Sequence, residues 1–176
     1  MKLITGDIWG ELGSAKVIFV TTNAEVNGAG RLVMGRGAAL QAAQLFPGLA
    51  EWLGRDLVVH KLVGKPYGLI VQSPAPAKGA GTFVGAFQVK FHWRDDADPD
   101  LIRFSVARLG QLAALLRPNV LAVNMPGVGN GRLREEDVLP LLLPLPNNVR
   151  VYRLPGGRDR PEDFDESAMR LKEGRC

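Results

Sequence analysis

The chain has 176 residues, of which 46% are hydrophobic and 23% charged, and its formal net charge at pH 7 is +4. This length predicts one domain that can bury a core without covalent cross-links. The one cysteine, Cys176, excludes a disulfide framework and a cysteine-based metal site. The mild positive charge fits an anionic small ligand and permits a nucleic-acid partner without requiring one.

The chain shows no targeting or membrane signal. Its longest apolar runs, such as residues 138–145, are too short to span a bilayer, and residues 1–15 do not have the pattern of a signal peptide. We therefore expect a cytoplasmic, monomeric protein that does not associate with a membrane.

Predicted strands and helices alternate along the chain. We expect strands at residues 2–5 and 16–22, a helix at 37–46 and one or two helical turns at 49–53. Strands at 57–63, 67–72 and 83–90 follow, with a loop at 73–82. Next come a long amphipathic helix through residue 116, capped by Asp98 or Asp100, a strand at 120–125, a helix at 134–143 and a strand at 148–154. The alternation predicts an α/β sandwich with a mixed or mostly parallel central sheet, and the polar tail from Gly156 either holds a short helix at 166–172 or frays.

Two glycine-rich loops carry the strongest functional signal. The first covers residues 23–37 and ends in Met34-Gly35-Arg36-Gly37, and the second has the sequence Pro126-Gly127-Val128-Gly129-Asn130-Gly131. Each follows an apolar strand and leads into a helix. This arrangement aims backbone N–H groups at an anion, so the pair predicts a diphosphate held between the two loops.

Four single residues have a functional and a structural interpretation. Asp7 either accepts a hydrogen bond from an adenine amino group or stabilises a turn, and Asn23 either binds a sugar hydroxyl or stabilises its own turn. Arg36 either contacts phosphate or is solvated. Lys90 either has a lowered pKa and acts as nucleophile or base, or is a surface lysine beside a core tryptophan, Trp93. Composition alone favours the structural role for Lys90.

The sequence gives no support for a metal site or for the common nucleotide-binding and nucleophile motifs. His60 and His92 are the two histidines and lie too far apart in the sequence for a convincing metal site. The chain has no Walker, dinucleotide-binding or nucleophile-elbow motif. We therefore expect neither a metal nor a cofactor.

The order of these signals resembles a macro domain, the ADP-ribose-binding module. Three stretches carry the resemblance: Ile4-Thr5-Gly6-Asp7-Ile8, the first loop with Met34-Gly35-Arg36-Gly37-Ala38-Ala39-Leu40-Gln41, and the second loop with Leu133 and Asp137-Val138 after it. The resemblance covers residues 2–154. It implies a three-layer α/β/α macro-domain fold with a mixed, mostly parallel central sheet over residues 1–155, and a polar tail over residues 156–176.

The resemblance also implies a ligand-binding set. The adenine would lie against Asp7 and Ile8, with Tyr152 either stacking on it or packing in the core. The distal ribose would reach Asn23. The diphosphate would lie among the loop residues Gly35, Arg36, Gly37, Gly127, Val128, Gly129, Asn130 and Gly131.

Within the family, the first loop resembles the subgroup that removes ADP-ribose from acidic side chains or DNA bases, and its phage-encoded relatives. In that subgroup a lysine before His-Trp acts at C1″ of the distal ribose. The stretch Val89-Lys90-Phe91-His92-Trp93 matches it, which makes Lys90 the catalytic candidate. Two departures are visible: Gly131 stands where the acidic-side-chain branch has an aspartate, and residues 24–32 are inserted relative to the DNA-base branch.

The sequence is compatible with four functions. The leading one is an ADP-ribosyl hydrolase that uses Lys90 on ADP-ribosylated DNA or protein. A reader that binds ADP-ribose without chemistry is the second. A phosphatase acting on ADP-ribose 1″-phosphate would use His92, and a nucleic-acid-binding module would use Trp93 and the mild basicity.

Overall fold

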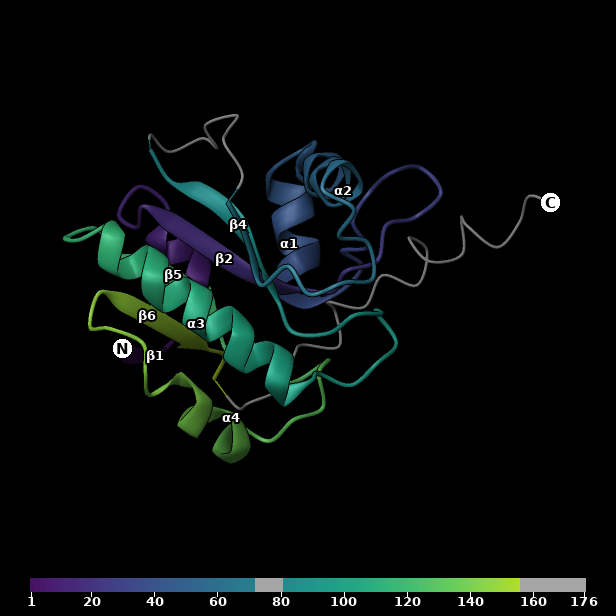
Figure 1. Cartoon of the computed structure of the whole chain (residues 1–176). Helices are drawn as coiled ribbons and strands as arrows, with labels where there is room; N and C mark the ends of the chain where they lie inside the picture. The colour runs from purple at the N-terminus through teal and green to yellow at the C-terminus, as the bar shows by residue number, and fades with distance from the viewer. Residues whose placement is uncertain (72–80, 156–176) are drawn as a thin grey trace.

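The computed structural model describes residues 1–71 and 81–155, and within them a sheet lies between two layers of helices (Figure 1). The sheet has six strands in the order β1-β6-β5-β2-β4-β3. Neighbouring strands are parallel except β3 and β4, which are antiparallel. The strands are β1 (Lys2–Thr5), β2 (Val17–Thr22), β3 (Leu69–Val71), β4 (Phe83–Gln88), β5 (Leu121–Asn124) and β6 (Val149–Arg153). The predicted mixed, mostly parallel sheet is confirmed.

The helices divide between the two faces of the sheet. Along β2, Val17 and Phe19 point into the core formed with α3 and α4, whereas Val20 points into the core formed with α1 and α2. This alternation is the period-two pattern of a strand that is buried on both faces. The helices are η1 (Ile8–Glu11, a 3₁₀-helix), α1 (Gly37–Leu45), α2 (Leu49–Val59), α3 (Pro99–Leu115) and α4 (Glu135–Leu142). The three-layer α/β/α arrangement is therefore confirmed.

One predicted strand is wrong. The valines of residues 57–63 favour a strand, but α2 continues through Val59 and the predicted helix at 49–53 is too short. Leu49, Leu53 and Leu57 are buried at a spacing of four residues, so packing on one helix face overrides the local preference of the valines.

The remaining element boundaries differ by a few residues. Strand β3 is shorter than predicted, and η1 was not expected. Asp98 rather than Asp100 caps α3, because its side chain accepts hydrogen bonds from the N–H groups of Asp100 and Leu101. The predicted tail at 156–176, for which we expect a short helix or fraying, and residues 72–80 lie outside the described residues.

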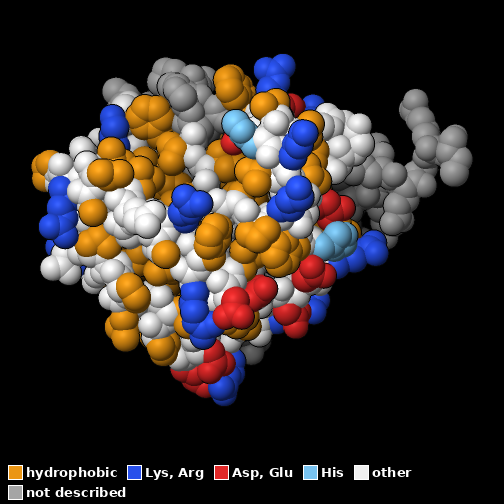
Figure 2. Space-filling view, viewed as in Figure 1, with side chains coloured by type: hydrophobic (Ala, Val, Ile, Leu, Met, Phe, Trp, Pro, Cys, Tyr) orange, Lys and Arg blue, Asp and Glu red, His pale blue; other side chains and the backbone are white. Residues whose placement is uncertain are grey.

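Charged side chains gather over α4 on the face shown in Figure 2. There Arg134 pairs with Glu136 and Asp137 on an exposed surface. Exposed pairs of this kind contribute little to stability. Among the described helices, none has the length and apolar character needed to cross a membrane.

Candidate functional site

The carboxyl ends of β2 and β5 separate and open a crevice in the sheet. Backbone pairing of the two strands extends to Phe19 and Val123. Beyond it the Asn124 side chain bridges the strands: Oδ1 accepts from the Thr21 N–H at 2.8 Å, and Nδ2 donates to Thr21 Oγ1 at 2.9 Å. The chain leaves β2 toward α1 on one face and β5 toward α4 on the other. Open α/β sheets bind ligands at such a point.

Buried hydrogen bonds hold the start of the first loop. The Tyr67 hydroxyl lies 2.5 Å from Thr22 Oγ1 and donates to the Asn23 carbonyl at 2.9 Å. Burial raises the pKa of Tyr67 well above its ordinary value, so the hydroxyl stays protonated. Asn23 in turn donates to the Val33 carbonyl and accepts from the Glu25 N–H. These bonds leave Asn23 one amide hydrogen and one oxygen lone pair for a ligand.

The second loop needs its glycines for two different reasons. Gly127 and Gly129 have φ of +73° and +74°, in the left-handed region that favours glycine. A Cβ at Gly131 would lie 2.3 Å from the Gly127 carbonyl oxygen. The aspartate that the acidic-side-chain branch carries at this position would therefore not fit without movement of the loop.

The amino end of α1 faces the same crevice. The helix begins at Gly37, and within the described residues no side chain caps it through a hydrogen bond. The first N–H groups of a helix have no partner inside the helix, and the helix dipole adds positive potential there. Gly37, Ala38 and Ala39 line the cleft, so this end of α1 is a suitable place for an anion.

Both glycine-rich loops line one cleft of about 450 Å³, as expected from the sequence. A smaller pocket of about 80 Å³ adjoins it. The two share Gly37, Ala38, Asn124, Val128 and Gly129 and therefore form one continuous groove. The larger cleft contains Asn23, Gly35, Arg36, Gly37, Lys90, Gly127, Val128, Gly129, Asn130 and Gly131, and the smaller pocket contains Asp7 and Ile8. All the predicted site residues lie along this groove.

Lys90 lies in the larger cleft and is only 8% exposed. Its Nζ donates to the carbonyls of Asp95 at 2.7 Å and Asn130 at 3.0 Å, with a third carbonyl, that of Trp93, at 3.5 Å. Burial lowers the pKa of Lys90, and the nearby Arg132 guanidinium lowers it further. Lys90 thus joins the end of β4 to the second loop and is easier to deprotonate than an ordinary lysine.

The lining of the larger cleft also carries an aromatic ring and positive charge. Trp93, Arg94, Arg36 and Arg132 all contribute to the lining. The Arg94 guanidinium lies 4.6 Å from the centre of the Trp93 ring, and Arg132 pairs with Asp96. This composition favours an anionic or aromatic ligand.

Neither histidine lines the groove. His92 Nδ1 accepts from the Arg94 N–H, and its Nε2 lies 3.0 Å from Glu25 Oε2. His60 pairs with Asp56 on the exposed side of α2. Over residues 1–71 and 81–155 there is no cluster of three or more histidine, cysteine, aspartate or glutamate side chains that could hold a metal ion.

The second pocket lies between η1 and the end of β6. Asp7 caps η1, because its Oδ1 accepts from the Trp9 N–H at 3.0 Å. It also lines the pocket, so its capping role does not remove it from the groove. Tyr152 also lines this pocket, and its hydroxyl donates to the buried carboxylate of Glu11.

Several groove residues were missed in the sequence. Thr21, Thr22 and Asn124 line the larger cleft at the strand ends, and Gln41 and Glu135 line the second pocket. Asn124 carried a usable signal, since it is a polar residue at the end of an otherwise apolar strand. Thr21 and Thr22 carry the same signal at the end of β2. Gln41 and Glu135 carry no local signal, because their place in the pocket depends on how their helices pack against the sheet.

No protein-family model and no curated protein matches the chain. Solved structures match along most of its length. The macrodomain of Thermus aquaticus DarG is 21% identical with a TM-score of 0.66, over 91% of this chain and 97% of that one. The macrodomain of Mycobacterium tuberculosis DarG is 24% identical with a TM-score of 0.66, over 86% and 95% of the two chains. The chain has the macrodomain fold.

A third structure of the same fold is Thermosipho africanus DarTG in complex with ADP-ribose. It is 24% identical, has a TM-score of 0.66, and is matched over 91% of this chain and 43% of its own. The resemblance to macro domains noted in the sequence is thus confirmed at the level of the fold. Function has to be argued from the groove itself, because one fold hosts different activities.

Proposed function

We propose that this macrodomain-fold chain binds ADP-ribose along the groove. The diphosphate lies between the two glycine-rich loops, the adenine lies in the pocket with Asp7 and Ile8, and the distal ribose lies beside Asn23 and Lys90. The observation that carries this proposal is that both loops and the amino end of α1 line one cleft. Each hydrogen bond from a backbone N–H to the charged diphosphate contributes about 1.5–3 kcal/mol.

Two structures of similar fold support the choice of ligand. Thermosipho africanus DarTG was determined in complex with ADP-ribose. An Oceanobacillus iheyensis macrodomain, 15% identical with a TM-score of 0.55, was determined with ADP. Both ligands contain adenosine and a diphosphate, which are the two groups that we assign to the groove.

We further propose that the chain hydrolyses ADP-ribosyl linkages. Lys90 would act at C1″ of the distal ribose, either as a base or as a nucleophile. The neutral amine is required for both roles, and burial favours it. The Trp93 ring and the arginines of the cleft lining support a nucleic-acid-linked substrate, while the lack of space at Gly131 argues against an acid-linked protein.

The nucleophilic route has a defined chemical balance. Nζ of neutral Lys90 forms a bond to C1″, and the bond from C1″ to the modified group breaks, with that group leaving as its protonated form. The ribose ring then opens as the proton on Nζ moves to the ring oxygen, which leaves an imine between Nζ and C1″. Water hydrolyses this imine, which releases ADP-ribose and restores the amine. Lys90 has to leave its carbonyl partners to react, and these partners are backbone atoms of turns beside the cleft.

A reader without catalytic activity is the second candidate. The observation in its favour is the contact of the Lys90 ammonium with the Asp95 and Asn130 carbonyls. Carbonyl oxygens stabilise the charged form of lysine, and in this role Lys90 would simply hold the second loop. The phosphatase is less well supported, because His92 does not line the groove and contacts Glu25.

Calorimetry with ADP-ribose tests the binding proposal, and absence of binding would refute it. Incubation with ADP-ribosylated DNA, acid-linked ADP-ribosylated protein and ADP-ribose 1″-phosphate then tests turnover by release of ADP-ribose or phosphate. Lys90→Ala is expected to abolish release and keep binding, while Lys65→Ala, at an exposed lysine, serves as the control. Trapping of an adduct on Lys90 with borohydride would distinguish nucleophile from base. Binding without release from any substrate would favour the reader.

A further inference from the structure

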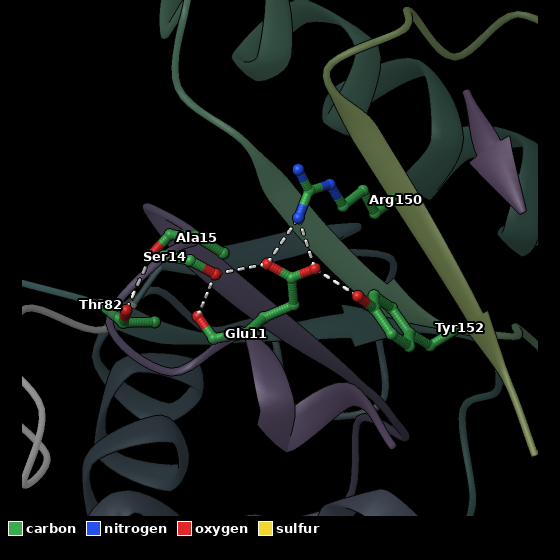
Figure 3. Close-up of polar contacts among 6 residues, drawn as sticks. All are labelled: Glu11, Ser14, Ala15, Thr82, Arg150 and Tyr152. Carbon is green, nitrogen blue, oxygen red and sulfur yellow. Dashed lines mark hydrogen bonds and ion pairs between the residues drawn. The ribbon is translucent and has the colours of Figure 1, made fainter. Parts of the chain in front are cut away.

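A buried carboxylate lies behind the second pocket. Glu11, at the end of η1, is 3% exposed, and it is the buried acidic residue of the described part of the chain. Arg150 Nη1 donates to both of its oxygens at 2.7 and 3.0 Å, and Ser14 Oγ donates to Oε2 at 2.7 Å. The Tyr152 hydroxyl donates to Oε1 (Figure 3). These hydrogen bonds replace the interactions with water that the carboxylate loses on burial, and so offset the free-energy cost of burying its charge.

The protonation states are set by the same contacts. Burial raises the pKa of Glu11, but the bonds from Tyr152, Ser14 and Arg150 outweigh it, and the pKa lies below its ordinary value. Burial and the neighbouring Glu11 carboxylate raise the pKa of Tyr152 to about 12. At neutral pH the carboxylate is therefore ionised and the tyrosine hydroxyl is its permanent donor.

The network connects the two walls of the second pocket. Asp7 and Ile8, at the start of η1, form one wall, and Tyr152 on β6 forms another. Glu11 is at the other end of η1 and bonds to Tyr152, so one carboxylate sets the distance between η1 and the tyrosine ring. Ile8 also belongs to the small apolar core against which Tyr152 packs. Glu11 itself is not part of the pocket lining.

We propose that Glu11 is a positioning residue for the nucleoside end of the bound ligand. By holding Tyr152 and η1 at a constant separation, it preforms the pocket that receives the adenine ring. This inference rests on the proposed function, because it assumes that an adenine nucleotide occupies the groove. When the walls of the pocket are already ordered in the free protein, binding does not incur the entropy cost of ordering them.

Calorimetry with ADP-ribose, combined with saturation-transfer NMR on the ligand, tests the inference. Glu11→Gln keeps the shape of the side chain but removes its charge, and Tyr152→Phe keeps the ring but removes the bond to Glu11. Both are expected to raise Kd about tenfold, which corresponds to the cost of ordering one pocket side chain on binding. Saturation of adenine H2 and H8 is expected to fall relative to H1″ of the distal ribose. Glu51→Gln, which breaks the exposed Arg31–Glu51 pair, is expected to change neither quantity.

The outcomes separate this inference from the proposed function. If the wild-type protein binds no ADP-ribose, the proposed function fails and the inference fails with it. If the wild type binds, and Glu11→Gln has the same Kd and the same ratio of adenine to ribose saturation, the inference alone is overturned. A rise in Kd with an unchanged ratio would show a general structural role and would also overturn it. Should Glu11→Gln not fold, Tyr152→Phe gives the same decision.

Discussion

Addition of a single methyl group at Gly131 is expected to distort the second loop. In Gly131→Ala the new Cβ would lie 2.3 Å from the Gly127 carbonyl oxygen and 2.7 Å from the Gly127 Cα. A close carbon–oxygen contact is roughly 3.3 Å, so the backbone has to open by about 1 Å. Both partners are main-chain atoms, and no side-chain rotation can relieve the contact.

This displacement sets the expected magnitudes. Overpacking costs about 1–3 kcal/mol, which for a domain of this size lowers Tm by about 2–12 °C. A hydrogen bond from the loop to the diphosphate that lengthens from about 2.9 to about 3.9 Å is lost. Loss of one charge-assisted bond worth about 1.5–3 kcal/mol raises the Kd for ADP-ribose by roughly 10- to 150-fold.

Calorimetry measures the change in Kd, and thermal unfolding measures the change in Tm. Two other glycines provide controls. At Gly64, with φ of +67° and no atom within 4 Å of an added methyl group, Ala costs about 1–2 kcal/mol of backbone strain but leaves binding unchanged. At Gly110 in α3, also with open space, Ala stabilises by about 0.5–1 kcal/mol. Wild-type affinity and Tm in Gly131→Ala would refute the reasoning.

Three further predictions follow from buried polar groups. Tyr67→Phe removes the hydroxyl that bonds Thr22 and Asn23 and is expected to lower the free energy of unfolding by about 1–3 kcal/mol in urea denaturation; an unchanged midpoint would contradict this. Because the pKa of Lys90 lies below 10.5, release of ADP-ribose is expected to rise with pH and level off before pH 10.5; a flat profile from about pH 6 to 10 would argue against a neutral amine. The ionised form of Glu11 contributes stability above pH 4.5 that is lost as pH falls through its lower pKa in the folded state, so Glu11→Gln is expected to show a shallower acid transition; identical transitions would disprove this.

Local sequence patterns were sufficient to predict those strands whose formation depends mainly on residues adjacent in the chain. The apolar run before Asn23 and the run before Pro126 predicted β2 and β5 within a residue or two. The same patterns failed at residues 57–63, where valines suggested a strand. The buried Leu49, Leu53 and Leu57 hold that segment in α2, and tertiary packing outweighed the intrinsic preference of Val58 and Val59.

Part of the site was also predictable from the local sequence. Backbone chemistry marked Gly127 and Gly129, since turns with positive φ select glycine and expose N–H groups. The need for glycine at position 131 could not be inferred locally as a packing requirement, because it comes from the fold of the loop back onto Gly127. Arg132, by contrast, had no pattern in the sequence that would place it beside Lys90.

By itself, the sequence determined the local units: which segments are buried strands, where two anion-binding turns occur, and a lysine beside an aromatic segment. Only the tertiary structure decided that β2 and β5 are neighbours, so that their loops face one cleft. It also decided that Glu11 meets Tyr152 across 141 residues and that Asn124 joins Thr21 across 103. The physical reason is that local preference depends on a few adjacent residues, whereas strand order and buried polar pairing depend on how the whole chain excludes water.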